Sequence, residues 1–238
     1  MARIFITGDT HRDQDWEKLN SKNFPEQGGL TKDDFVIILG DFGGVWHGDI
    51  RLPDDDDAYI LDQYEKRSFT TLFVDGNHEN HPAIAAYPEE EWCGGRVHRV
   101  RDSILHLMRG QIYEIAGKTF FTMGGATSTD KDYRVEGVTW WPGEVPSKEE
   151  MDAAIENLEN HDFAVDYILT HECGYDLLVN EGLPAWHTNR EDPVQQFMWS
   201  LDNVLPLQFK HWYFGHHHID KQIDNQHTAV FSRRIEIT

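Results

Sequence analysis

Five short apolar runs recur along the chain, and each one stops abruptly at a glycine or a polar cluster. The runs are RIFI (3–6), FVIIL (35–39), TTLFV (70–74), FAVDYILT (163–170) and HWYF (211–214). Runs of four to eight β-branched and aromatic residues that end in Gly or Asp are typical of buried strands. Because polar residues follow directly, we expect them at the carboxyl ends of strands, where open α/β sheets bind ligands.

Helical patterns lie between some of these runs, so the chain is predicted to be α/β. Apolar residues at helical spacing predict helices over 56–68, 147–161 and 192–205. The second helix opens with Ser147 and Glu150, which have the spacing of a capping box.

The remaining patterns predict mixed sheets within one domain. Residues 111–125 are predicted to form a strand pair that turns at 116–117, and residues 227–238 to form one or two closing strands. Acidic residues at 54–57 suit the positive end of a helix better than a calcium site. Strands that alternate with helices, together with hairpins, indicate mixed sheets covered by helices. No linker is visible, so we expect a single domain over 1–238.

The charge balance restricts the partners of the chain. It has 21 Lys and Arg against 42 Asp and Glu, which gives a formal net charge of −21. This charge argues against stable binding of duplex nucleic acid, which requires a basic face. A phosphate substrate is still compatible with it, because bound divalent metals would add positive charge locally.

Cysteine content and hydropathy favour a cytoplasmic protein. The two cysteines, Cys93 and Cys173, are too few for a disulfide framework, and we expect them to be reduced and buried. The start MARIFITGD lacks the apolar run of a signal peptide, and no stretch approaches the ~20 apolar residues of a membrane helix. We therefore expect a cytoplasmic protein that does not cross or bind a membrane.

Every one of the five strand ends carries side chains that bind metals well. In chain order these side chains are Asp9, His11, Asp41, Asn77, His78, His171, His216 and His218. Carboxylates, imidazoles and one amide oxygen suit Zn²⁺, Mn²⁺ or Fe. In extended backbone, residues two apart point the same way, so each D-x-H or H-x-H pair can face one site while Thr10 and His217 face away.

Other interpretations of these residues exist. The histidines at 216–218 could be a tag or a solvated patch, but they follow a strand pattern and do not lie at a terminus. A lone histidine in a core is more often a hydrogen-bonded structural residue. The ordered recurrence after five strand patterns favours a shared metal site.

The order of the elements resembles the calcineurin-like metallophosphoesterase superfamily. That family's pattern of D-x-H, GD, GNH-[DE], H and GH-x-H is matched by GDTH (8–11), GD (40–41), GNHE (76–79), TH (170–171) and GHHH (215–218). The match spans nearly the whole chain. The resemblance implies a four-layer α/β/β/α sandwich of mixed sheets flanked by helices, with the site at strand carboxyl ends.

The resemblance also implies two divalent or trivalent metal ions, either Mn, Fe or Zn. Their ligands would form two sets with one bridging residue: Asp9, His11 and His218; Asn77, His171 and His216; and, between them, Asp41. A hydroxide shared by the metals would attack the phosphorus of a phosphate monoester or diester in line. His78 would assist the leaving group, and the substrate would be a phosphorylated small molecule or nucleotide-like. Glu79 would cap the following turn or orient a ligand.

Contacts to the rest of the substrate are less well defined by the sequence. Arg12 follows the first metal pair and could reach a phosphate, and Arg134 lies in the stretch TSTDKDYRVEGVTWWPGE. Its neighbours Trp140 and Trp141 either stack on a base or fill a core under this loop. His47 could line the mouth of the site or lie on the surface.

Two long stretches, 124–146 and 173–191, lack clear periodicity. Loops of this length in a compact domain are often lids or binding loops.

The chain departs from the family's protein-phosphatase branch at the second element. That branch carries GDxxDRG, whereas this chain reads GDFGGVW, with Gly44 and Val45 in place of Asp and Arg. The departure argues against the alternative of a serine/threonine phosphoprotein phosphatase. A non-catalytic metal-bound scaffold is an alternative from another class, and a metal sensor would not need His78. The sequence leaves the oligomeric state open.

Overall fold

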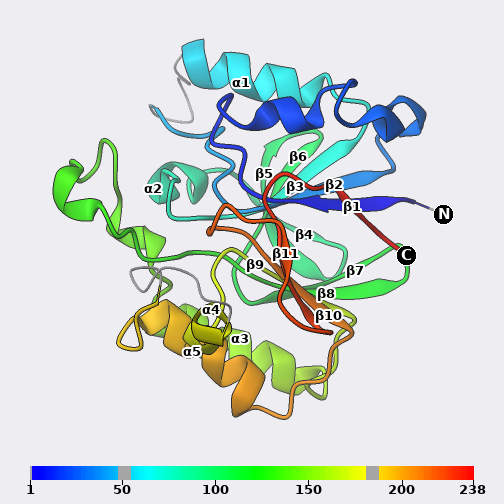
Figure 1. The fold of residues 1–238 in the computed structure, drawn as a ribbon. Coiled ribbons are helices and arrows are strands. Elements are labelled where there is room, and N and C mark those ends of the chain that lie inside the picture. Colours follow the sequence, from blue (N-terminus) through cyan, green and yellow to red (C-terminus); the bar gives the residue numbers. More distant parts are fainter. Residues whose placement is uncertain (1, 48–54, 181–187) are drawn as a thin grey trace.

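The computed structural model describes residues 2–47, 55–180 and 188–238, and their strands form two mixed sheets (Figure 1). The first sheet contains, in spatial order, β13 (Ile235–Ile237), β1 (Ile4–Thr7), β2 (Phe35–Leu39), β3 (Thr70–Val74), β6 (Ile104–Leu107), β5 (Gly95–Arg101) and β4 (Glu89–Trp92). The second contains β11 (Lys221–Gln222), β12 (His227–Ala229), β10 (His211–Phe214), β9 (Tyr167–Thr170), β8 (Lys118–Met123) and β7 (Gln111–Ile115).

The inner strands of each sheet are parallel. In the first sheet these are β1, β2, β3 and β6, and in the second β12, β10, β9 and β8. The outer strands β13, β5, β11 and β7 pair with them antiparallel. Parallel neighbours place their carboxyl ends at the same edge of a sheet, and this arrangement gathers the polar residues that follow them.

Helices cover the outer faces of the two sheets (Figure 1). The helices are α1 (Asp55–Glu65), α2 (His81–Ile84), α3 (Lys148–Asn160), α4 (Tyr175–Asn180) and α5 (Pro193–Asn203). Short 3₁₀ turns occur at η1 (Trp16–Leu19), η2 (Pro25–Gly29), η3 (Lys131–Tyr133) and η4 (Pro142–Glu144). Helix α1 lies against the first sheet, whereas α3, α4 and α5 lie against the second.

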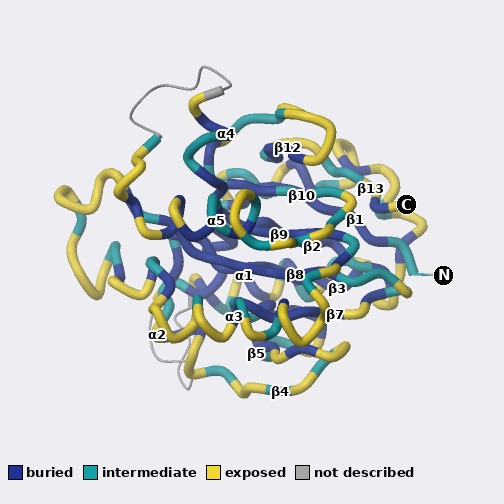
Figure 2. Tube along the Cα trace, turned by 90° about the horizontal axis from the view of Figure 1, so that it is seen from below, coloured by how far each residue is buried: buried dark blue, intermediate teal, exposed yellow. Residues whose placement is uncertain are grey.

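Alternation along the strands explains this packing. In β2, Val36 and Ile38 join the apolar cluster under α1, whereas Ile37 and Leu39 join the cluster between the two sheets. Side chains of a strand point alternately to its two faces, so an unbroken apolar run fits a strand that is covered on both sides. Figure 2 shows the result, with β9 buried and the outer turns exposed.

The predicted α/β class with mixed sheets and helices is confirmed, and so are the main local elements. The capping box of Ser147 and Glu150 is present at the start of α3. The hairpin of β7 and β8 turns at Ala116 and Gly117, whose φ angles are 52° and 77°. Helix α1 is shorter than the predicted 56–68. Residue 54 and residues 181–187, which fall in two of the predicted segments, lie outside the described residues.

Strands β4 and β5 are absent from the sequence-based prediction because their sequences, EEEW and GRVHRVR, are highly charged. Both lie towards one edge of the first sheet, and the side chains of β4 alternate between exposed and partly buried. The expectation of two buried thiols is wrong for Cys93, which is exposed, whereas Cys173 is buried, and both are free.

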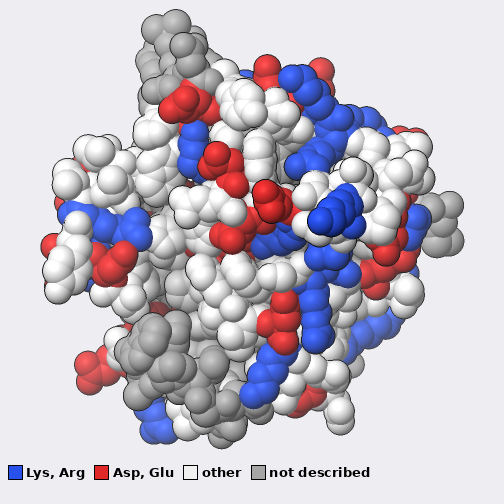
Figure 3. Space-filling model, turned by 45° about the horizontal axis from the view of Figure 1, so that its top comes forward, with Lys and Arg blue, Asp and Glu red and all other residues white. Residues whose placement is uncertain are grey.

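Charge is mixed on the surface. On the face drawn in Figure 3, Lys and Arg side chains lie among Asp and Glu side chains. Across the described ranges, none of the helices has the length and apolar character needed to cross a membrane.

Candidate metal centre

The carboxyl ends of five strands from both sheets meet at one place. The Leu39 carbonyl at the end of β2 accepts a 2.7 Å hydrogen bond from His171 Nδ1, which follows β9 in the other sheet. Gly215, after β10, donates its backbone N–H to the His171 carbonyl at 3.1 Å. These contacts bring together the predicted residues Asp9, His11, Asp41, Asn77, His78, His171, His216 and His218.

Two glycines permit this close approach. A Cβ atom on Gly215 would lie 2.4 Å from the Leu39 oxygen and 2.6 Å from Asp9 Oδ1. A Cβ atom on Gly76 would lie 2.1 Å from Asp41 Oδ1. Any larger residue would separate the strand ends, which explains why the sequence places Gly directly before these polar residues.

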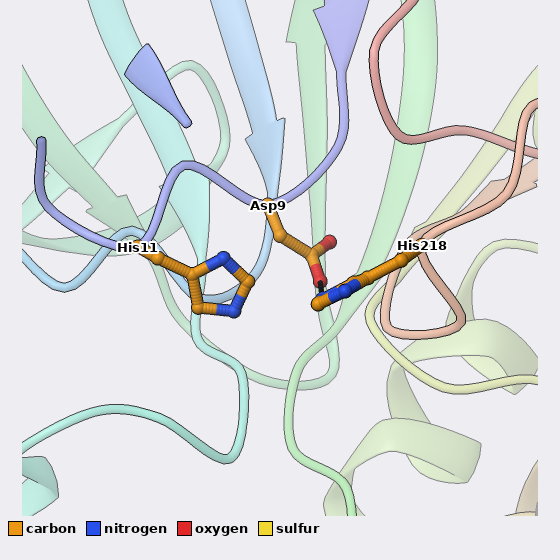
Figure 4. Close-up of side chains that lie close together, drawn as sticks. All are labelled: Asp9, His11 and His218. Atoms are coloured by element: carbon orange, nitrogen blue, oxygen red, sulfur yellow. Dashed lines mark ion pairs between the residues drawn. The ribbon is translucent and has the colours of Figure 1, made fainter. Parts of the chain in front are cut away.

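The first cluster consists of Asp9, His11 and His218, which approach one another from the loops after β1 and β10 (Figure 4). His218 Nε2 lies 3.1 Å from Asp9 Oδ2, and the His218 ring stacks on Phe231 with centroids 4.6 Å apart. Asp9 is fully buried, and its other oxygen accepts a hydrogen bond from the His216 backbone N–H at 3.1 Å. Ligand atoms of the three side chains lie within 4.8 Å of one another.

Asp15 fixes the orientation of His11. His11 Nδ1 lies 2.8 Å from Asp15 Oδ2, so this nitrogen carries a proton and donates it. In the neutral ring, Nε2 therefore has a lone pair, and it points at Asp41 Oδ2 from 3.2 Å. With a neutral ring, two acceptors would face each other at this distance, whereas a protonated ring would donate to Asp41.

On the other side of Asp41, His171 also directs its Nε2 atom towards a carboxylate oxygen. His171 Nδ1 donates to the Leu39 carbonyl, which leaves a lone pair on Nε2 of the neutral ring. That Nε2 atom lies 3.5 Å from Asp41 Oδ1 and 3.1 Å from Asn77 Oδ1. His171 is completely buried, and these distances leave no room for another atom between the groups.

A chain of hydrogen bonds sets the orientation of the Asn77 amide. Asn77 Nδ2 donates to Ser128 Oγ at 3.0 Å, and Ser128 Oγ in turn donates to Glu144 Oε2 at 2.5 Å. Glu144 also accepts the Ser128 backbone N–H at 3.0 Å. Because the amide nitrogen is held by Ser128, the carbonyl oxygen must face His171.

The side chains around Asp41 thus fit a pair of cations. Each Asp41 oxygen faces an imidazole nitrogen whose ring proton is committed elsewhere, and bound cations would replace these acceptor–acceptor contacts by coordination. The pKa values show the same need for positive charge. Burial opposes protonation of His11, but Asp41 raises its pKa to about 9. Burial likewise disfavours the Asp41 carboxylate, yet His171 and His78 hold its pKa well below the usual range.

His78 and Arg134 lie beside this cluster. The His78 backbone N–H donates to Asp41 Oδ1 at 2.7 Å, and burial lowers the pKa of its ring. Arg134 binds Asp130 through Nε and Nη2 at 2.6 and 2.8 Å, and its Nη2 lies 3.5 Å from His78 Nε2. The loop 124–146 therefore places a guanidinium next to His78.

Arg12 has a different environment. Its Nη1 donates to Asp57 Oδ1 at 2.5 Å and to the Gly43 carbonyl at 3.2 Å, so it forms an ion pair within the protein. Trp141 is buried and packs edge-on against Trp46 with centroids 5.2 Å apart, which agrees with the core-filling alternative.

Two other predicted positions lie at opposite extremes of burial. His47 is exposed. Glu79, in contrast, is buried and accepts the backbone N–H groups of Phe42 and Gly43, which ties the GNHE segment to the loop after β2.

The expectation of extended backbone through the D-x-H and H-x-H pairs is wrong. His11, His216 and His218 have φ angles of 42°, 64° and 52°, in the left-handed region. The backbone N–H groups of Thr10 and His11 both donate to the Asp41 carbonyl, so the chain turns sharply after β1. Left-handed non-glycine residues are uncommon, and they cluster where surrounding contacts hold a functional site in shape.

His217, which the sequence leaves without a clear role, connects two loops. Its Nε2 donates to Glu172 Oε1 at 2.7 Å, and the same oxygen accepts the Cys173 backbone N–H at 2.8 Å. Glu172 Oε2 lies 3.7 Å from His216 Nε2. This buried carboxylate links the loop after β9 to the histidines after β10.

Sequence reasoning missed the residues that orient the candidate ligands: Asp15, Ser128, Glu144 and Glu172. Ser128 and Glu144 lie in the aperiodic stretch 124–146, where no local pattern marks them. Asp15 follows His11 by four residues, and a carboxylate behind a metal-binding histidine is a common arrangement. The four-residue spacing of His11 and Asp15 could therefore have predicted the role of Asp15 from the sequence.

No protein-family model matches the chain, and no curated protein sequence matches it. Among solved structures, GAP50, the anchor in the inner membrane complex of Plasmodium, is similar with a TM-score of 0.50 and 13% identity, over 97% of this chain and 71% of that chain. A protein of unknown function from Aquifex aeolicus matches with a TM-score of 0.38 and 14% identity, over 88% of each chain. At these identities the likeness to GAP50 concerns the fold alone.

Proposed function

We propose that the chain is a dinuclear-metal hydrolase of phosphate esters and belongs to the calcineurin-like metallophosphoesterase superfamily. On this proposal its two sheets and outer helices are the four-layer α/β/β/α sandwich of that family. The observation that carries the proposal is the position of Asp41 between His11 Nε2 and His171 Nε2, at 3.2 and 3.5 Å. A carboxylate between two such lone pairs is suited to bridging two cations.

The proposed ligands follow from the clusters. Asp9, His11 and His218 would hold one metal, and His171, His216 and Asn77 the other, with Asp41 shared. When bound, Mn, Fe or Zn ions would activate a water and offset charge on the phosphoryl oxygens. Carboxylate, imidazole and amide donors suit these ions, so metal identity stays open between them.

The surrounding residues would act on the substrate directly. His78, anchored by its backbone to Asp41, would give a proton to the leaving oxygen. Arg134 would bind a phosphoryl oxygen beside it, because its Nη2 lies 3.5 Å from His78 Nε2 and Asp130 orients its guanidinium. We assign Arg12 no part in this, because its partner Asp57 is buried, whereas Asp130, which binds Arg134, is half exposed to solvent.

A small or nucleotide-like phosphate ester is favoured over a phosphoprotein as the substrate. Val45, at the position where the protein-phosphatase branch carries an arginine, is buried and apolar, so it offers no charge to a phosphate. A metal-bound scaffold is the alternative from another class. The position of Arg134 next to His78 favours the enzyme, because a scaffold needs no cation at a leaving-group histidine.

The test is hydrolysis of p-nitrophenyl phosphate and bis(p-nitrophenyl) phosphate by Mn²⁺-loaded protein. Asp41→Asn serves as the inactive blank, and Asp33→Asn, an exposed carboxylate with the same chemical change, serves as the matched control. We expect hydrolysis by the native chain and by Asp33→Asn but not by Asp41→Asn. Preference for the diester would define a phosphodiesterase, and preference for the monoester a phosphomonoesterase.

Arg134→Gln sharpens the assignment. If Arg134 binds the phosphoryl group, this variant raises KM for the monoester, which carries more negative charge, more than for the diester. If neither ester is hydrolysed above the blank with Mn²⁺, Zn²⁺ or Fe²⁺, the scaffold alternative replaces the enzyme.

A further inference from the structure

A second polar site lies next to the metal cluster, at the ends of β3 and β6. It is a cavity of about 530 Å³, within the range of cavities that hold small ligands. Asp75 lines it, whereas Asn77, two residues later, faces His171 in the metal cluster. None of the eight candidate metal-site residues is among the described residues that line it.

The guanidinium group of Arg109, which lines this cavity, is already hydrogen-bonded within the protein. Arg109 donates through Nε and Nη2 to Asp75 Oδ2 at 2.9 and 2.5 Å, and through Nη2 to the Gly143 carbonyl at 2.8 Å. Its Nη1 reaches Glu150 at 3.3 Å. An incoming anion would therefore have to compete with two carboxylates for this guanidinium.

The histidines of the cavity present acceptors. His106 Nε2 lies 3.2 Å from Asp75 Oδ1 and must donate to it, which leaves a lone pair on Nδ1 of the neutral ring. His98 Nδ1 lies 2.9 Å from that atom and must carry the shared proton, so His98 Nε2 is an acceptor. Burial lowers the pKa of His98 to about 4, which keeps this ring neutral near pH 7.

His81 also lines the cavity, and its ring has one acceptor nitrogen. Its Nε2 donates to the Gly76 carbonyl at 3.0 Å, which leaves a lone pair on Nδ1. That Nδ1 atom is buried and has no hydrogen-bond partner among the described residues. Almost none of its surface is open to the cavity, so a ligand there contacts other atoms of His81 and not this nitrogen.

The rest of the wall is apolar, with Ile84, Met108 and Val145 among the lining residues. We propose that this cavity binds a small molecule that has an apolar body, an N–H or O–H donor and no negative charge. His98 Nε2 accepts from the donor, and the aliphatic side chains contact the body. The inference does not depend on phosphate hydrolysis, and it assigns this cavity a ligand of opposite character to a phosphate ester.

The test uses three matched probes and methyl NMR on the full chain. The probes are indole, which has an N–H donor, 1-methylindole, which lacks it, and indole-3-carboxylate, which adds a negative charge. We expect indole to give saturable shifts of the Ile84 and Met108 methyl signals. Each of the other two probes should bind roughly fivefold or more weakly, because one leaves the acceptor unpaired and the other brings a charge towards Asp75.

Two variants localise the binding. Ala85 lines the cavity but is exposed, so Ala85→Trp fills the entrance without disturbing the core, and it should abolish the indole shifts. His98→Phe keeps a ring of similar size, lacks the accepting nitrogen and should remove the preference for indole over 1-methylindole. The inference is overturned if indole causes no methyl shifts up to its solubility limit, if 1-methylindole binds equally well, or if Ala85→Trp leaves indole affinity unchanged.

Discussion

Two buried carboxylates, Asp41 and Asp75, follow neighbouring parallel strands, and their surroundings are opposite. Asp75 receives donors from Arg109 and His106 and is complete within the protein. Asp41 faces His11 Nε2 and His171 Nε2, whose ring protons are held by other acceptors. The same residue type in a similar place is thus a structural ion pair in one case and a candidate metal ligand in the other. The hydrogen-bond donors nearby make the difference.

The largest expected effect comes from removing the charge of Asp41. In the metal-loaded protein, Asp41→Asn should lower kcat for the better of the two nitrophenyl esters by on the order of 10⁴-fold, because both proposed metals share this carboxylate. The metal-free fold should lose less stability than it does in Asp75→Asn, since the asparagine oxygen can still accept the His78 backbone N–H and His11, unlike Arg109, can give up its proton when the carboxylate is gone. Steady-state kinetics and urea unfolding in EDTA measure the two quantities, with Asp33→Asn as the control. A similar loss of stability in EDTA would show that Asp41 is structural, as Asp75 is.

Asp75→Asn should have the opposite pattern. Removing this charge leaves Arg109 buried with an incomplete partner, and we expect the free energy of unfolding to fall by about 3–5 kcal/mol, with or without metal. Urea unfolding in EDTA and in Mn²⁺ measures it. In the double variant with Arg109→Met, the loss should be smaller than the sum of the two single losses, because no unpaired charge remains. Strictly additive losses would contradict the pairing.

The sequence predicts those features of the site that are marked by neighbouring residues, and it misses those that depend on residues far apart in the chain. The strand ends at Asp9, Asp41, Asn77, His171 and His216 were predicted, because each polar residue directly follows an apolar run. Strands β4 and β5 were not, since they lie towards a sheet edge and carry charged side chains.

The hydrogen-bonding partners were beyond the sequence for a related reason. Arg109 meets Asp75 across 34 positions, and Ser128 meets Asn77 across 51. No spacing rule connects residues so far apart. Only the folded chain therefore shows that Asp75 has hydrogen-bond donors for both oxygens, whereas Asp41 faces imidazole nitrogens that carry lone pairs.

A smaller effect should follow from releasing the Asn77 amide. Ser128→Ala removes the group that holds Asn77 Nδ2, so the amide can rotate its oxygen away from His171. We expect Mn²⁺ affinity at the proposed site of Asn77, His171 and His216 to fall by about 10–100-fold. Isothermal titration calorimetry measures it, and the exposed Ser21→Ala is a matched control. Unchanged affinity would show that Asn77 is not a ligand.

The smallest expected effect concerns Asp15. Asp15→Asn keeps an acceptor for His11 Nδ1 but loses the charge, so we expect a decrease of roughly fivefold in metal affinity. Calorimetry should assign this decrease to one of the two proposed sites, because His11 belongs to one cluster. An equal decrease at both sites would contradict the division of ligands.

The central claim is that Asp41 holds two metals together, and metal counting with spectroscopy tests it most directly. Mn²⁺ bound per chain is measured by equilibrium dialysis with elemental analysis, and coupling between the ions by electron paramagnetic resonance. The account predicts two Mn²⁺ per chain with an exchange-coupled signal, retained in Asp33→Asn and lost in Asp41→Asn. Fewer than two ions in the native chain, or a coupled signal that survives Asp41→Asn, would contradict it.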